Sequence, residues 1–164
     1  MATKTLDDLF YAGLRDLLYA EKKVLKALPR MARGAQAKEL KAAFEKHKEQ
    51  TEGHVERLQL VFDIIDKRAM GKTCPAIDGI IEEGEEILEE FKGTTAIDAG
   101  LIGAAQAVEH YEITRYGTLK RWAENLKLPK AAELLDATLK EESKTNEDLT
   151  ALADAGLNKQ AVAA

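Results

Sequence analysis

The 164-residue sequence has little cysteine and little proline. Each shortage limits the structures that the chain can form. The single cysteine, Cys74, excludes an internal disulfide and a cysteine-based zinc site. The three prolines leave long segments free to remain helical. No uncharged stretch approaches the roughly 20 residues that a membrane-spanning helix requires. We therefore expect a cytoplasmic protein without a membrane segment.

The charge balance excludes a further class of protein. The formal net charge is −5, and no long basic run is present. Nucleic-acid binding usually needs a basic patch, so we expect no nucleic-acid partner. The length suits one domain with a sizeable core. We expect this domain to span residues 1–164, with residues 154–164 as a flexible tail.

Apolar residues recur at intervals of three and four along most of the chain, which is the spacing of amphipathic helices. The pattern predicts four long helices and a shorter one, near residues 6–33, 37–66, 95–126, 128–153 and 77–91. Thr5 and Asp8 have capping-box spacing before the first helix, and Thr95 and Asp98 have it before the fourth. Pro29 is expected to kink or end the first helix.

The connections between these helices predict the fold class. Short connections join the first long helix to the second and the third long helix to the fourth, so each pair should form an antiparallel hairpin. About 30 residues separate the hairpins and include the shorter helix. The prediction is an all-α, ferritin-like four-helix bundle of two antiparallel hairpins, with an extra short helix in the long crossover.

Glutamates lie inside the predicted apolar stripes. At about 100° per residue, Glu112 falls at the centre of its stripe and Glu109 at the edge. Glu21 and Glu142 are central on their own helices. Snorkelling of a long side chain would explain one such residue. Three central carboxylates need another explanation, because a buried unpaired carboxylate costs several kcal/mol, and metal ions would compensate their charge.

A weak internal repeat supports a shared site. A shift of 91 residues places Glu21 on Glu112 and Thr51 on Glu142. The same shift therefore aligns both helices of the first hairpin with those of the second. This relation suggests two similar hairpins facing each other about a pseudo-twofold axis, with their stripe centres meeting in mid-bundle.

Four segments carry a resemblance to a known family: "DLLYAEKKVLKALPRMA", "HKEQTEGHVERL", "QAVEHYEITRYGTL" and "TLKEESKTNEDLTALA". They resemble the YciE/YciF-type bacterial stress-associated proteins, which belong to the ferritin-like superfamily and are related in fold to rubrerythrin. The resemblance covers the chain up to its tail. It implies a helical bundle, a homodimer and a carboxylate-bridged dinuclear metal site, with iron as first choice and manganese as second.

The superfamily pattern is a Glu from one helix of each hairpin and Glu-x-x-His from the other. This sequence departs from it, because Thr51 occupies the glutamate position on the second helix and Thr145 the histidine position on the last. Gln50 is neutral where the resemblance implies a carboxylate. The candidate metal ligands are Glu21, Glu109, Glu112, Glu142, His54, His47 and Gln50.

Such a site predicts reaction with dioxygen or peroxide, in ferroxidase-like or peroxide-consuming chemistry. A second hypothesis is a non-enzymatic dimeric stress-response bundle whose degenerate metal site, which lacks part of the ligand set, serves assembly or partner binding. A third hypothesis, a plain bundle without metal, leaves the inward glutamates unexplained. Elsewhere, we expect Cys74 to be incidental, His110 to be exposed or at a dimer contact, and Tyr116 and Trp122 to act in core packing rather than as redox relays.

Overall fold

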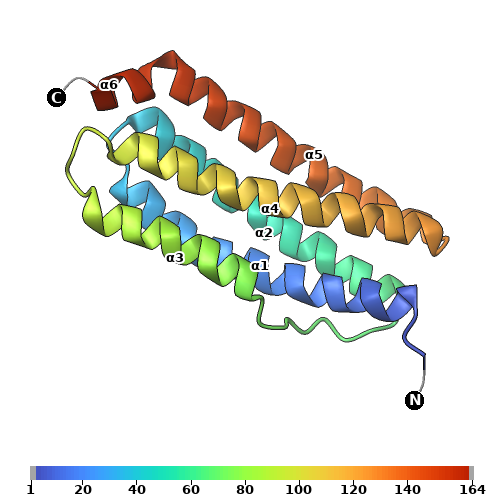
Figure 1. Ribbon diagram of the computed structural model, residues 1–164. Coiled ribbons are helices and arrows are strands. Elements are labelled where there is room, and N and C mark those ends of the chain that lie inside the picture. The colour runs from blue at the N-terminus through green and yellow to red at the C-terminus, as the bar shows by residue number, and fades with distance from the viewer. Residues whose placement is uncertain (1–2, 163–164) are drawn as a thin grey trace.

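The computed structural model describes residues 3–162, which contain helices and no strand. In chain order the helices are α1 (Leu6–Gly34), α2 (Lys38–Ile64), α3 (Pro75–Glu90), α4 (Ile97–Asn125), α5 (Pro129–Leu152), the π-helical segment η1 (Ala153–Leu157) and α6 (Asn158–Val162). Figure 1 shows α1, α2, α4 and α5 side by side as a bundle, with α3 along one side. The predicted all-α class is confirmed.

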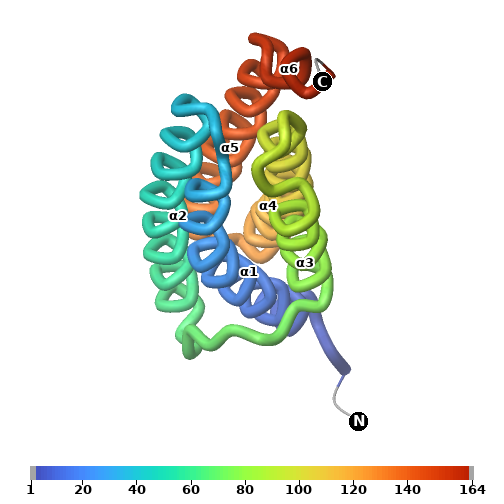
Figure 2. Tube along the Cα trace, turned by 90° about the vertical axis from the view of Figure 1, so that its left-hand side faces the viewer, coloured from blue at the N-terminus to red at the C-terminus, as the bar shows by residue number. Residues whose placement is uncertain are grey.

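The connectivity also agrees with the sequence pattern. Helix α1 packs against α2 and α4 packs against α5, while contacts between α2 and α5 and between α1 and α4 close the bundle. The crossover between the hairpins passes over α1, where the backbone nitrogen of Lys72 donates to the carbonyl of Arg15 (Figure 2). Helix α3 then packs against α4 and α1. Two antiparallel hairpins with one long crossover is the arrangement of ferritin-like bundles.

Two apolar clusters fill the bundle, one toward each end, and a polar layer lies between them. On α1, Glu21 lies between Leu17 of one cluster and Val24 of the other. Each fully buried Leu or Phe stabilises the fold by about 1.5–3 kcal/mol. The two clusters therefore offset the cost of burying the polar layer.

The first predicted helix start is confirmed. The carboxylate of Asp8 accepts a hydrogen bond from the backbone nitrogen of Thr5 at 2.9 Å, which completes one arm of the capping box. Pro29 lies inside α1 and does not end it, because the helix continues to Gly34.

The predicted capping box of Thr95 and Asp98 is wrong. The residue that precedes α4 is Ala96, and Asp98 instead turns toward the connection between α1 and α2. Its carboxylate accepts hydrogen bonds from the backbone nitrogens of Gln36 and Ala37 at 2.7 and 2.8 Å. Asp98 therefore ties the two hairpins together at this end of the bundle.

The expectation of a frayed tail after residue 153 is wrong for residues 154–162, which are helical. Gly156 lies inside η1 with φ 143°, and this conformation lets the chain bend there between α5 and α6. Leu157 packs against the apolar core, which gives the segment a reason to remain helical. Residues 163–164 lie outside the described part of the chain. No helix within residues 3–162 has the length and hydropathy of a membrane span.

Candidate metal centre

Every long helix contributes to the polar layer, and six of its side chains offer carboxylate or imidazole groups. They are Glu21 from α1, His47 and His54 from α2, Glu109 and Glu112 from α4, and Glu142 from α5. All six are at most 3% exposed. The pairs on α2 and α4 are seven and three residues apart, so each pair lies on one helix face. The structure thus brings together six of the seven predicted ligands.

The six side chains form two overlapping groups in which ligand atoms lie within 4.8 Å of one another. The first, called here the His47 group, consists of His47, Glu109, Glu112 and Glu142. The second, the His54 group, consists of Glu21, His54 and Glu142. Because Glu142 belongs to both, the arrangement suits two neighbouring ions that share one carboxylate.

The shortest distances inside the groups are close to those between ligands of one metal ion, and others are longer: Nε2 of His47 lies 3.7 Å from Oε2 of Glu142, and Nδ1 of His54 lies 3.5 Å from Oε1 of Glu21. The Nε2 atom of His47 lies 3.0 Å from Oε1 of Glu109, and Nδ1 of His54 lies 2.9 Å from Oε1 of Glu142. Neither nitrogen has a hydrogen-bond partner, so these close contacts are not aligned as hydrogen bonds. Atoms that bind one octahedral ion at about 2.1 Å stand about 3 Å apart, which is the spacing of these two shortest pairs.

Carboxylate oxygens in the layer are also without hydrogen-bond partners. They comprise Oε2 of Glu21, Oε2 of Glu109, and both oxygens of Glu112 and of Glu142. Buried polar atoms in proteins nearly always have a partner, and exceptions call for an unplaced water or ion. A donor set of hard carboxylate oxygens with imidazole nitrogens fits iron or manganese.

The electrostatics of the layer favour an added cation. Burial raises the pKa of Glu109 to about 7 and that of Glu142 to about 8. Burial, with the negative charges of Glu21 and Glu142, raises the pKa of Glu112 well above its usual value. Without an ion, these carboxylates retain protons at pH values where exposed carboxylates are charged.

The two histidines differ in their charge. Burial lowers the pKa of His47, which favours a neutral ring with a lone pair for a metal. Burial also opposes charge on His54, but the carboxylates of Glu142 and Glu21 outweigh this effect and raise its pKa to about 10. In the metal-free protein, His54 is therefore the cation that partly neutralises the layer.

The outer nitrogen of His54 leads to residues that the sequence analysis missed. Its Nε2 atom lies 2.9 Å from Oε2 of Glu141, and Arg57 contacts both oxygens of that carboxylate at 2.9 and 2.7 Å. Hydrogen bonds from Arg57 lower the pKa of Glu141 despite its partial burial, so the carboxylate accepts and Nε2–H of His54 donates. Arg57 lies three residues after His54 and is therefore its neighbour on the surface of α2, which was the available sequence signal for a charged residue beside His54.

Three more side chains form hydrogen-bond contacts with residues of the layer. The Tyr116 hydroxyl donates a short hydrogen bond to Oε1 of Glu21, so Tyr116 orients this carboxylate in addition to its core packing. Thr51 Oγ1 donates to the carbonyl of His47 at 2.8 Å, within the same helix. Thr145 Oγ1 lies 3.4 Å from Nδ1 of His47, on the side of the ring away from the carboxylates.

Three other residues singled out in the sequence have different surroundings. Gln50 is half-buried and lines a pocket next to His47, so it lies beside the layer and its role as a ligand stays a prediction. His110 is exposed, as predicted. Cys74 is buried, and its Sγ atom lies 3.0 Å from the hydroxyl of Tyr111.

The fold and this layer define the class: a helical-bundle protein with a buried cluster of glutamates and histidines that could hold a metal. Residues 5–162 match the family described as Domain of unknown function (DUF892), and the chain belongs to this family. The chain is 43% identical over 162 residues to Protein YciF of Escherichia coli (strain K12), covering 98% of each chain.

Solved structures agree with this assignment. The crystal structure of the E. coli stress protein YciF matches with a TM-score of 0.91 and 42% identity, over 96% of this chain and 99% of that chain. A protein of Rhodopseudomonas palustris, described as YcfI, matches with a TM-score of 0.88 and 42% identity, over 91% of this chain and 95% of that one. The resemblance inferred from the four sequence segments is therefore confirmed.

Proposed function

We propose that this protein is a ferritin-like, stress-associated metal-binding protein with a carboxylate-bridged dinuclear centre. The supporting observation is the set of buried, unpartnered ligand atoms in two groups that share Glu142. The similarity to a relative described as a stress protein supports a role in the stress response.

The ligand set favours iron first and manganese second, because both accept carboxylate and imidazole ligands. In this assignment Glu142 would be a ligand of both ions. His47, Glu109 and Glu112 would hold one ion, and Glu21 and His54 would hold the other. The departures at Thr51 and Thr145 leave each ion fewer protein ligands than the superfamily pattern provides, so coordination positions would remain open.

When bound, a ferrous centre would supply electrons to dioxygen or peroxide, which is the basis of the proposed ferroxidase-like or peroxide-consuming activity. The chain's own residues prepare this site. The two apolar clusters border the layer toward each end of the bundle, and Tyr116 fixes the orientation of Glu21. His54 and the buried carboxylates hold the protons that metal binding would displace.

The test is metal analysis of the purified protein, followed by anaerobic Fe(II) loading and exposure to oxygen. We expect up to two iron ions per chain and a large loss in the Glu112→Ala variant. The Glu124→Ala variant is the matched control, since Glu124 is exposed on the same helix and should bind iron as the wild type does. Equal background iron in all three proteins would reject the proposal.

The second candidate is a non-enzymatic, dimeric stress-response bundle with a degenerate metal site. Thr51 favours it, because this residue satisfies its own helix instead of supplying a carboxylate to the layer. Stoichiometric iron without turnover of dioxygen or peroxide would support this candidate. Size-exclusion chromatography with light scattering measures the molar mass of the protein and would test the homodimer that both candidates include.

A further inference from the structure

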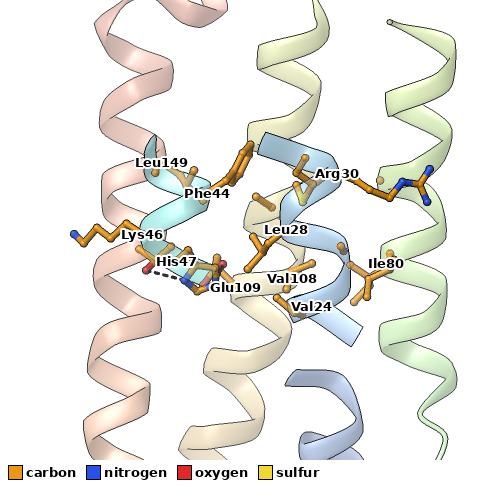
Figure 3. Close-up of a pocket in the computed structure, with 18 of the residues that line it drawn as sticks. Val24, Leu28, Arg30, Phe44, Lys46, His47, Ile80, Val108, Glu109 and Leu149 are labelled. Carbon is orange, nitrogen blue, oxygen red and sulfur yellow. Dashed lines mark hydrogen bonds and ion pairs between the residues drawn. The ribbon is translucent and has the colours of Figure 1, made fainter. Parts of the chain in front are cut away.

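A narrow pocket leads to one side of the metal-ligand layer. Its volume is about 60 Å³, and its walls come from α1, α2, α3, α4 and α5. Figure 3 shows Val24, Leu28, Phe44, Val108 and Leu149 around it. These apolar side chains make most of the wall.

The pocket reaches one of the two ligand groups. His47 and Glu109 line it, whereas Glu21 and His54 do not (Figure 3). A molecule in the pocket would therefore meet the His47 group first. The His54 group faces a different neighbour, the carboxylate of Glu141. The two ends of the candidate centre thus have different access.

The rim of the pocket is polar. Lys46 and Asp148 form an ion pair at 3.8 Å, and Arg30 pairs with Glu85. These side chains are exposed, so the pocket connects the protein surface with the buried layer. Exposed ion pairs of this kind contribute little to stability.

Size and polarity together select the class of occupant. The pocket exceeds the roughly 10–15 Å³ that a single water needs and is well below the ~150 Å³ of a cavity that binds benzene, so it suits only small molecules. Apolar walls give water or hydrogen peroxide few hydrogen-bond partners, whereas an apolar diatomic molecule loses none on entry.

We propose that this pocket binds an apolar diatomic molecule of the dioxygen class and presents it to the His47 group. Its delivery to the metal rests on the proposed function, but binding in the pocket does not. Binding and delivery are therefore tested separately, first in metal-free protein and then in the iron-loaded form.

Xenon, an apolar atom, is the probe for metal-free protein. Crystals under xenon pressure, or xenon NMR in solution, should show one site in the pocket. Ala43→Leu should abolish it, because Ala43 lines the pocket, and Ala42→Leu is the control one residue away on the exposed face of α2. If Ala43→Leu does not fold, Ala27→Leu fills the pocket from α1. Absence of xenon from wild-type protein would overturn the proposal.

The second measurement is the rate at which dioxygen oxidises the iron-loaded protein. The pocket-filling variant should react at least about ten times more slowly, with unchanged iron content, and the control should match the wild type. Bound xenon with an unchanged oxidation rate would refute delivery through this pocket. Failure to load iron would instead count against the proposed function and leave the xenon result standing.

Discussion

The Nε2 atom of His54 lies 2.9 Å from Oε2 of Glu141, so one imidazole connects the buried ligand layer to a carboxylate that is about one-third exposed. Arg57 holds that carboxylate through both of its oxygens. A hydrogen bond of this kind fixes the tautomer and ring orientation of a ligating histidine. Here it holds Nδ1 of His54 toward Glu142, 2.9 Å away, where loss of the Nδ1 proton would expose a lone pair to a metal.

Replacing Glu141 should therefore weaken one metal position. We expect Glu141→Ala to lower the affinity of the ion in the His54 group by about 10- to 100-fold, the usual effect of losing such a partner. The His47 group makes no contact with Glu141 and should change little. Anaerobic titration with Fe(II) or Mn(II), monitored by calorimetry, would resolve two binding steps and show which one weakens.

The control for this experiment is Asp136→Ala. Asp136 also lies on α5 and pairs with Lys120 at 2.8 Å, but it has no contact with the ligand layer. This variant should keep both binding steps. Equal weakening in the two variants would mean that Glu141 acts on general stability rather than on His54.

Asp98→Ala should destabilise the metal-free protein by about 1–3 kcal/mol. The buried Asp98 carboxylate accepts the backbone nitrogens of Gln36 and Ala37, and its removal leaves those donors without their charged partner. Urea denaturation measures the loss, and Asp154→Ala, at an exposed position, is the control. An unchanged free energy of unfolding would show that water replaces Asp98 at no cost.

Asp98 also illustrates what the sequence could and could not predict. The long helices were predictable because their apolar stripes repeat over many turns and include buried residues at each end of the bundle. The hydrogen-bond partner of Asp98 was not predictable, because Ala37 lies 61 residues earlier in the chain. The nearby Thr95 has the spacing of a capping box with Asp98 and offered an alternative partner. A capping pattern identifies an acceptor without identifying the donor that it meets in the fold.

The candidate site shows the same division. Glu21, Glu112 and Glu142 were predictable because each lies at the centre of an apolar stripe, where a carboxylate conflicts with its surroundings. Glu141 is rotated by about 100° from Glu142 and lies at the partly exposed edge of α5, so no conflict marked it. Its role depends on how closely α2 packs against α5, which periodicity on a single helix does not encode.

Glu112→Gln should stabilise the metal-free protein. Burial and the neighbouring carboxylates raise the pKa of Glu112, so folding takes up a proton, and the stability of the wild type falls as pH rises above the pKa of the unfolded chain. The amide carries no charge and removes this loss. The expected gain is on the order of 1 kcal/mol and should grow with pH. Destabilisation of this variant would indicate that the carboxylate has a protein partner.

Metal binding should release protons and strengthen as pH rises. In the metal-free protein burial raises the pKa of Glu109 to about 7 and of Glu142 to about 8, so both groups are largely protonated below these values. A metal needs the deprotonated carboxylates, and protons compete with it at lower pH. Calorimetry in buffers of different ionisation enthalpy, from about pH 6 to pH 9, counts the released protons. The Glu109→Gln variant should release fewer protons, and its metal affinity should depend less on pH at the acidic end of this range. A metal affinity that is independent of pH would place the metal away from these carboxylates.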